Sequence, residues 1–147
     1  MDDHELLVAA LEQARIGRAE GGVPVGAAIG VDGRLLAVGR NRRVQLGSAI
    51  RHGETDALEN AGRQTAAVYR RATMATTLSP CDMCTGAILL FGIPRVVIGE
   101  NTTFMGNEEL LRARGVELVH LDSEECRLLM ADFIAEFPEL WNEDIGV

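Results

Sequence analysis

The sequence predicts a three-layer α/β/α sandwich around a mixed sheet of about five strands. From Ala72 onward, stretches with strand character alternate with stretches of helical periodicity, and strand–helix–strand crossovers require parallel pairing. Before that point, two strand-like stretches flank Val31–Gly33, a hairpin signal that predicts an antiparallel pair. The 147 residues contain no repeat, linker or low-complexity segment, so we expect one domain over residues 1–147.

The first half of the chain is expected to form two helices and the hairpin. Apolar residues recur at helical spacing over 6–14, and Gly21-Gly22 ends that helix. Residues 24–30 and 34–38 have the composition of strands. A polar loop over 40–51 then leads to a second helix over about 52–61, which Gly62 ends.

The second half is expected to alternate between strands and helices. A strand over 72–78 leads to Ser79-Pro80, a helix-start signal in which Ser79 would be the N-cap residue. The apolar helix that follows ends at Gly92. The remaining expected elements are a strand over 95–98, a helix over 107–114, a strand over 116–121, a helix over 123–136 and a last turn after Pro138.

Charge and hydropathy argue against nucleic-acid and membrane partners. Acidic residues outnumber Lys and Arg by 22 to 14, and a net charge of -8 repels phosphate backbones. No apolar run approaches membrane-spanning length, and Met1–Glu5 is acidic where a secretory leader would be basic. With only three cysteines, we expect a cytoplasmic protein whose thiols serve a metal or catalysis rather than disulfides.

Two short motifs carry residues suited to metal chemistry. His52-Gly53-Glu54 opens the second expected helix, and Pro80-Cys81-Asp82-Met83-Cys84 opens the third. Catalytic zinc sites use three protein ligands and leave the fourth position open, and His52, Cys81 and Cys84 can supply three. A helix N-terminus favours the thiolate that a metal needs. Glu54 is expected to reach the reacting water as a proton shuttle without binding the metal.

The two motifs together are far more specific than either alone. His-x-Glu followed by Pro-Cys-x-x-Cys is the signature of the zinc nucleobase deaminases. A structural zinc site is the alternative, and it would need a fourth ligand from Cys126, His4 or His120. A redox Cys-x-x-Cys is a second alternative, but it explains neither His52 nor Glu54.

The chain resembles the fungal-type cytosine deaminases of the cytidine deaminase superfamily, and the resemblance extends over nearly its whole length. The stretches that carry it are Gly21–Pro24, Leu58–Asn60, Thr77–Ala87, Gly92–Arg95 and Glu143–Gly146. The departures are a shorter N-terminus and first hairpin, Asn142 after Trp141 where the fungal type has an aromatic residue, and Val25 in place of an isoleucine. These departures concern the substrate more than the reaction.

The resemblance implies a role for each of several further residues. Asn41 would hydrogen-bond the pyrimidine, and the backbone N–H of Gly53 would meet its carbonyl group. The Ser79 carbonyl and the Asp144 carboxylate would hold the amine. Phe104 would stack on the ring, Trp141 would cover it from a C-terminal lid, and Val25 would lie against the base. The resemblance also implies a homodimer.

The function that these observations predict is zinc-dependent hydrolysis of a free pyrimidine base, with cytosine and water giving uracil and ammonia, in pyrimidine salvage. A deaminase of guanine, of a nucleoside or of another small heterocyclic amine is the first alternative. A tRNA adenosine deaminase, which must flip a base out of RNA, and a zinc module without turnover are the others. Taken singly, Asn41 could be a turn residue, Phe104 a core residue and Trp141 a simple anchor of the C-terminus.

Overall fold

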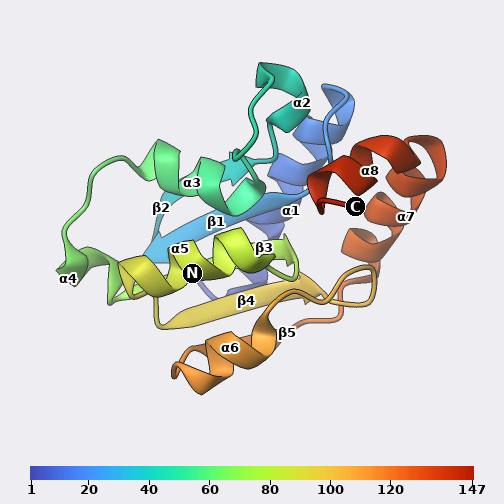
Figure 1. Ribbon diagram of the computed structural model, residues 1–147. Coiled ribbons are helices and arrows are strands. Elements are labelled where there is room, and N and C mark those ends of the chain that lie inside the picture. Colours follow the sequence, from blue (N-terminus) through green and yellow to red (C-terminus); the bar gives the residue numbers. More distant parts are fainter.

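A computed structural model describes residues 1–147 and contains one five-stranded sheet with helices on both faces (Figure 1). The strand order is β2-β1-β3-β4-β5. β1 (Gly26–Val31) pairs antiparallel with β2 (Arg34–Arg40) and β3 (Ala72–Leu78), whereas β4 (Arg95–Glu100) and β5 (Glu117–His120) continue from β3 in parallel. The predicted mixed sheet and the α/β/α class are therefore confirmed.

The hairpin between β1 and β2 turns on two residues. Asp32 and Gly33 both have positive φ angles, of 53° and 76°. A two-residue turn of this hand matches the right-handed twist of the strands, and Asp and Gly tolerate positive φ better than other residues do. The predicted antiparallel hairpin is confirmed at this point in the chain.

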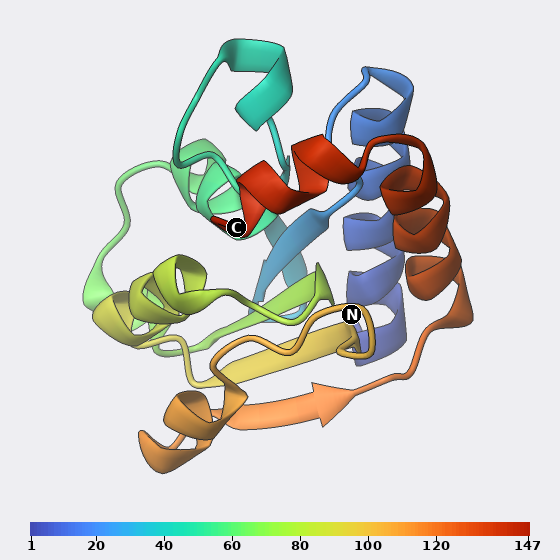
Figure 2. The same cartoon turned by 45° about the vertical axis from the view of Figure 1, so that its right-hand side comes forward.

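One face of the sheet is covered by α1 (Asp3–Ala19) and α7 (Glu124–Glu136), which lie side by side in Figure 2. The side chain of Asp2 accepts a hydrogen bond from the backbone N–H of Glu5, which fixes the start of α1. The apolar stripe of α1 packs on residues from the middle strands, and the buried members of this cluster are Leu6, Leu7, Ala10, Leu11, Ala28, Ala75, Val97 and Cys126.

The opposite face is covered by α3 (Gly53–Ala61), α5 (Asp82–Phe91) and α6 (Glu108–Ala113). Successive strand residues point to opposite faces, so the neighbours of the residues that meet α1 pack on this side. The larger core cluster includes Ala27, Ile29, Met74, Val96 and Ile98 from the strands with Ala57, Ile88 and Leu111 from the helices.

A third cluster lies at the end of the sheet where β3 finishes and β1 begins. The final helix, α8 (Pro138–Asp144), docks there through Trp141, which is its only buried residue. Trp141 packs with Val23, Val25, Leu78, Met130 and Phe133. The expected last turn after Pro138 is thus a helix that covers one end of the sheet.

Several local expectations are wrong or incomplete. Ser79 does not cap α5: the helix begins at Asp82 with Cys81 as its N-cap residue, because the Ser79 hydroxyl donates to Glu108 and accepts from Gly106 instead. The expected loop over 40–51 contains a short helix, α2 (Arg43–Leu46), and α4 (Ala66–Tyr69) was not predicted. None of the helices is both long and apolar enough to cross a membrane.

Candidate active site

Chemically reactive side chains gather at the end of the sheet beneath α8. Because β1 runs antiparallel to its neighbours, the start of β1 lies at the same edge as the ends of β2 and β3. α3 and α5 both begin at that edge, so their N-terminal ends face one another across it. The fold therefore brings both sequence motifs to one place.

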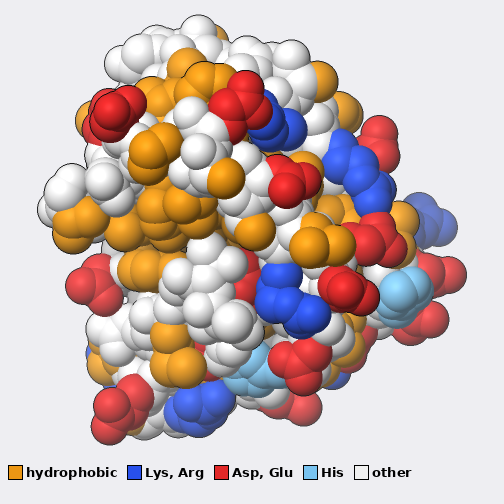
Figure 3. Space-filling model, turned by 90° about the vertical axis from the view of Figure 1, so that its right-hand side faces the viewer, with side chains coloured by type: hydrophobic (Ala, Val, Ile, Leu, Met, Phe, Trp, Pro, Cys, Tyr) orange, Lys and Arg blue, Asp and Glu red, His pale blue; other side chains and the backbone are white.

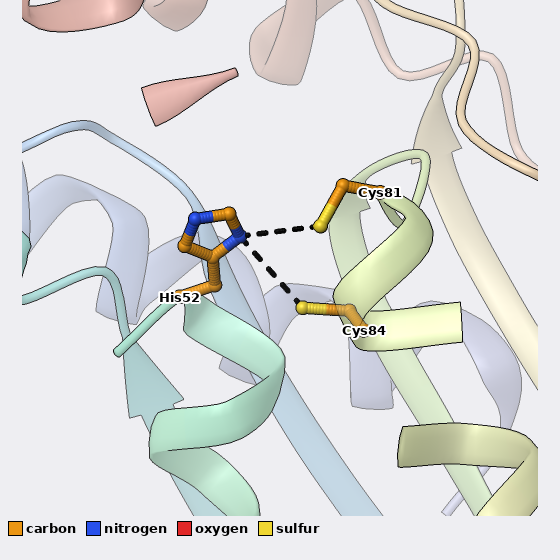
Figure 4. A group of neighbouring side chains, drawn as sticks. All are labelled: His52, Cys81 and Cys84. Carbon is orange, nitrogen blue, oxygen red and sulfur yellow. Dashed lines mark hydrogen bonds between the residues drawn. The ribbon is translucent and has the colours of Figure 1, made fainter. Parts of the chain in front are cut away.

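His52, Cys81 and Cys84 form a compact group whose candidate ligand atoms all lie within 4.8 Å of one another. In Figure 4, one ring nitrogen of His52 faces both sulfur atoms. Nδ1 of His52 is 3.4 Å from Sγ of Cys81 and 3.8 Å from Sγ of Cys84. A nitrogen and two sulfurs converging from two helix starts match the donor set of a catalytic zinc site.

The protonation of this group favours a thiolate next to an imidazolium. Hydrogen bonding from Cys84 lowers the pKa of Cys81 to about 4, against the effect of burial and with help from His52. Burial disfavours the charged form of His52, but the Cys81 hydrogen bond and the charges of Asp144 and Glu54 raise its pKa to about 9. The Cys81 partner and burial raise the pKa of Cys84 well above its usual value. A metal ion binding here must therefore displace protons.

The segment that carries His52 is held by a hydroxyl and a buried carboxylate. The backbone N–H of His52 donates to Oγ1 of Thr55 at 2.8 Å. Asp56, fully buried in α3, accepts from Nε of Arg51 at 2.9 Å and from the backbone N–H of Arg40 at 2.9 Å. Asp56 thus links the residue before His52 to the end of β2, an arrangement that no sequence pattern predicted.

Glu54 is 3% exposed and lies on the first turn of α3. Burial raises its pKa to about 7, although the positive charge of His52 acts in the opposite direction. A carboxylate with a pKa near neutrality can both accept and release a proton at physiological pH. The environment of Glu54 suits a proton shuttle.

A small cavity joins these side chains to most of the residues expected to contact a base. Its walls are Val25, Asn41, His52, Glu54, Leu78, Ser79, Cys81, Phe104, Trp141, Asp144 and Ile145. Leu78 and Ile145 were not predicted as site residues, although each lies within a stretch on which the resemblance rests. Gly53 is not a wall residue, but a methyl group there would lie 3.0 Å from the carbonyl oxygen of Val25, so its backbone adjoins the cavity.

A hydrogen bond between the last residue of α8 and the residue that directly follows β2 ties α8 to the sheet. Nδ2 of Asn41 donates to Oδ1 of Asp144 at 2.7 Å, and the same oxygen is 3.6 Å from Nε2 of His52. Burial raises the pKa of Asp144, and His52 and Asn41 partly offset this effect. Arg43 adds a contact from α2, with Nη1 3.5 Å from Oε1 of Glu143. Phe104 meets Trp141 edge-on, with ring centroids 6.1 Å apart.

Comparison with known proteins decides the family. The model of the cytidine and deoxycytidylate deaminase zinc-binding region matches residues 1–100. The cytosine deaminase of Candida albicans is 56% identical over 146 residues, which cover 99% of this chain and 97% of that protein. The chain belongs to the cytidine and deoxycytidylate deaminase family. The expected resemblance, the zinc cofactor (Zn²⁺) and the zinc-dependent aminohydrolase class are therefore confirmed.

Two further proteins similar to this chain share less of its sequence. A tRNA-specific adenosine deaminase of Streptococcus pyogenes is 35% identical over 127 residues, covering 84% of this chain and 79% of that one. A structure of guanine deaminase from Nitrosomonas europaea aligns with a TM-score of 0.72 at 24% identity, covering 88% of this chain and 83% of that one. The structural likeness at this identity supports the shared fold alone.

Proposed function

We propose that this chain hydrolyses free cytosine to uracil and ammonia. One observation carries the proposal: a single small cavity is lined by two of the three candidate zinc ligands, Glu54 and the Asn41–Asp144 pair, and α8 covers it. The 56% identity to a cytosine deaminase supports the same substrate.

His52, Cys81 and Cys84 would hold the zinc ion, which when bound supplies a water molecule acidic enough to attack at neutral pH. Glu54 takes the proton from that water and gives it to the ring nitrogen beside the amine-bearing carbon. Once the water oxygen is bonded to the amine-bearing carbon, Glu54 would take the proton of that new hydroxyl group and pass it to the amine. The carbon–nitrogen bond then breaks, ammonia departs, a carbonyl group remains and the ring nitrogen keeps the first proton. Burial of Glu54 keeps competing water from this transfer.

Gly53 and the remaining wall residues would bind and orient the base. The Asn41 amide and the backbone N–H of Gly53 would pair with polar groups of the ring, while the Ser79 carbonyl and the Asp144 carboxylate would hold the amine. Asn41 is 1% exposed and Ser79 is 3% exposed, so water cannot replace a missing hydrogen-bond partner there. A ligand that leaves these polar groups unpaired would therefore bind with a less favourable free energy. Val25, Phe104 and Trp141 would enclose the flat faces of the ring.

The covered cavity supports a free base over a nucleoside or a base within RNA. Trp141 is 7% exposed, and the Asp144 side chain is 6% exposed, so both side chains are buried where α8 meets the cavity. On the side that carries α7 and α8, acidic and basic side chains are interspersed and form no continuous basic patch (Figure 3). The net charge of -8 also disfavours a polyanion.

A panel of amines tests the substrate. The zinc-loaded protein is incubated with cytosine, cytidine, guanine, adenine and a tRNA, and released ammonia is measured together with the deaminated product. We expect uracil and ammonia in equal amounts from cytosine, at a rate far above that with the other compounds. Faster release from guanine, cytidine or tRNA would assign the chain to that substrate and contradict the proposal.

We propose that two copies of the chain associate through the face that carries α5. The large apolar side chains exposed there include Ile50 (63% exposed), Leu90 (77%) and Phe91 (39%). Ile50 and Phe91 border a groove of about 700 Å³ that lies between α3, α4 and α5. Exposed apolar side chains in one patch are typical of a surface that is covered in the assembled protein. Light scattering of the unmodified protein should give twice the mass of one chain, and the Leu90→Glu variant should give the mass of a single chain. An unmodified protein with the mass of a single chain would contradict the dimer.

We also propose a cytoplasmic location and a role in pyrimidine salvage. Three free cysteines, two of them in a candidate metal site, suit a reducing compartment. A cell that cannot synthesise pyrimidines should grow on cytosine when it expresses this chain, and it should fail to grow with the Glu54→Ala variant. If cells that express the unmodified chain grow on uracil but not on cytosine, as the Glu54→Ala cells should, the salvage role is contradicted.

A further inference from the structure

The segment 101–107 carries Phe104 to the cavity although it contains no helix or strand. It connects β4 to α6 and passes beside the residues that precede Cys81. An irregular segment next to an active site is positioned only as well as its backbone hydrogen bonds allow. The groups that accept those bonds here are the buried Glu100 carboxylate, the Ser79 hydroxyl and the Pro80 carbonyl oxygen, and the Ser79 hydroxyl is in turn bonded to the buried Glu108 carboxylate.

Glu100 fixes the beginning of the segment. Glu100 is 1% exposed, and its Oε2 accepts hydrogen bonds from the backbone N–H groups of Thr102 at 2.8 Å and Thr103 at 2.9 Å. One carboxylate oxygen thus holds the two residues that come directly before Phe104.

Glu108 fixes the end of the segment through an intermediate hydroxyl. The Ser79 hydroxyl donates to Oε2 of Glu108 at 2.6 Å, and the same oxygen atom of Ser79 accepts from the backbone N–H of Gly106 at 2.9 Å. Because its hydrogen is directed to Glu108, the hydroxyl presents a lone pair to Gly106. A methyl group at Gly106 would lie 1.7 Å from the carbonyl oxygen of Pro80, so the two segments are in direct contact.

Glu108 is a buried charge with an unusual number of partners. It is 1% exposed, and although burial raises its pKa, the bonds from Ser79 and His120 bring the pKa below its usual value. A buried carboxylate is costly unless several donors surround it. Its partners come from four parts of the chain: Ser79, Asn101, Arg112 and His120.

We propose that Glu108 is a positioning residue that acts through the hydroxyl of Ser79 to hold the segment 101–107, and with it Phe104, against the substrate cavity. Ser79, which this chain of bonds includes, and Phe104, which it positions, are both wall residues of the cavity. The inference rests on the proposed function for its substrate, cytosine. Phe104 would contact the ring in the ground state and in the transition state alike, so its displacement should weaken binding more than it slows chemistry.

Ser79→Ala removes the hydroxyl but keeps the backbone carbonyl that would hold the amine. We expect this variant to raise KM for cytosine by roughly tenfold, the order of an aromatic contact, while kcat and the zinc content stay close to those of the unmodified protein. Glu108→Gln should also raise KM. Because Asn101 and Arg112 both donate to Oε1, the amide oxygen of the new Gln must stay there, and its N–H groups must face Ser79. In the unmodified protein the Ser79 hydroxyl donates to this position, so the variant places two donors against each other. Glu108→Gln also carries the test if Ser79→Ala does not fold.

Ser123→Ala is the matched control, because it too removes a hydroxyl that accepts a backbone hydrogen bond, from Cys126 at 3.2 Å, but at the start of α7. It should leave KM unchanged. A second readout is acrylamide quenching of Trp141, the only tryptophan, whose edge-on neighbour is Phe104. Quenching should increase in Ser79→Ala and Glu108→Gln but not in Ser123→Ala.

A double-mutant cycle decides whether the effect passes through Phe104. In a Phe104→Leu background, Glu108→Gln should change KM by less than about twofold, because the contact it positions is already lost. The proposal would be overturned if Glu108→Gln changed KM equally in the unmodified and the Phe104→Leu backgrounds. It would also be overturned if a folded, zinc-loaded Ser79→Ala variant had the same KM and the same Trp141 quenching as the unmodified protein. If the unmodified protein does not deaminate cytosine, the proposed function fails, and the quenching experiment still decides the positioning role.

Discussion

Replacing Gly106 with alanine should remove most of the activity, because the segment that carries Phe104 would no longer fit against Pro80. A methyl group at Gly106 would lie 1.7 Å from the Pro80 carbonyl oxygen, whereas real contacts of this kind are not shorter than 3.0 Å. The two segments must therefore separate by about 1.3 Å or more. Pro80 precedes the candidate ligand Cys81, so either segment that moves affects the site.

The separation also breaks two hydrogen bonds, from the N–H of Gly106 to Ser79 at 2.9 Å and from the N–H of Asn107 to Pro80 at 3.2 Å. Two such bonds contribute about 1–3 kcal/mol to the free energy of unfolding, which corresponds to a fall in Tm of about 5 °C. A displacement of about 1 Å at reacting groups can lower a rate by about 100-fold. We therefore expect kcat/KM for cytosine to fall by about 100-fold.

The assay is initial ammonia release over a range of cytosine concentrations, with thermal unfolding and zinc content measured on the same samples. Gly17→Ala, within α1, is the matched control. A methyl group at Gly17 would lie 3.6 Å from Cδ of Arg40, which is an ordinary van der Waals contact. This variant should keep full activity and an equal or higher Tm. A Gly106→Ala variant with kcat/KM within about threefold of the unmodified protein would refute the reasoning.

The remaining predictions concern the metal site. Glu54→Ala should keep zinc and the fold but lose at least about 100-fold in kcat, because Glu54 moves protons and is not a ligand; loss of zinc, or retained activity, would count against that role. Cys81→Ala and Cys84→Ala should each lose zinc on metal analysis, whereas Cys126→Ala, which lies away from the site, should retain zinc and activity. Zinc affinity should fall as pH decreases from 8 to 6, because His52, with a pKa of about 9, and Cys84, with a raised pKa, both carry protons that zinc must displace. Calorimetry in buffers of different ionisation enthalpy would detect the released protons, and an affinity independent of pH would contradict the assignment of these ligands.

The elements that the sequence predicts well are those with local signals. The hairpin follows from Asp32-Gly33, and the parallel half of the sheet follows from the alternation of strands and helices after Ala72. The two short motifs predicted a group of three ligands, and the structure brings His52, Cys81 and Cys84 together. Each of these predictions depends on residues that are close in sequence or on a rule of chain topology.

The features that could not be predicted depend on contacts between distant residues. Ser79 before Pro80 has the local pattern of an N-cap residue. Its hydroxyl group instead donates a hydrogen bond to Glu108, which is distant in sequence, and the helix begins at Asp82. An Asp is usually found at the surface, yet Asp56 is fully buried, and Arg51 and the backbone N–H of Arg40 donate hydrogen bonds to its carboxylate. The buried polar groups of this protein are fixed by tertiary partners, and local sequence patterns do not contain that information.

The ratio of kcat/KM for cytosine to kcat/KM for cytidine tests the central claim most directly. The Asn41–Asp144 hydrogen bond and buried Trp141 lie at the cavity wall, and we expect them to exclude a sugar. Asn41 would also lose its proposed hydrogen bond to the base when a ribose replaces the ring N–H. A site built around such a hydrogen bond rejects the analogue that lacks it by about four to five orders of magnitude. We expect cytosine to be preferred by about that factor with the zinc-loaded protein. Equal values, or a preference for cytidine, would contradict the assignment of a free-base deaminase and leave only the zinc chemistry in place.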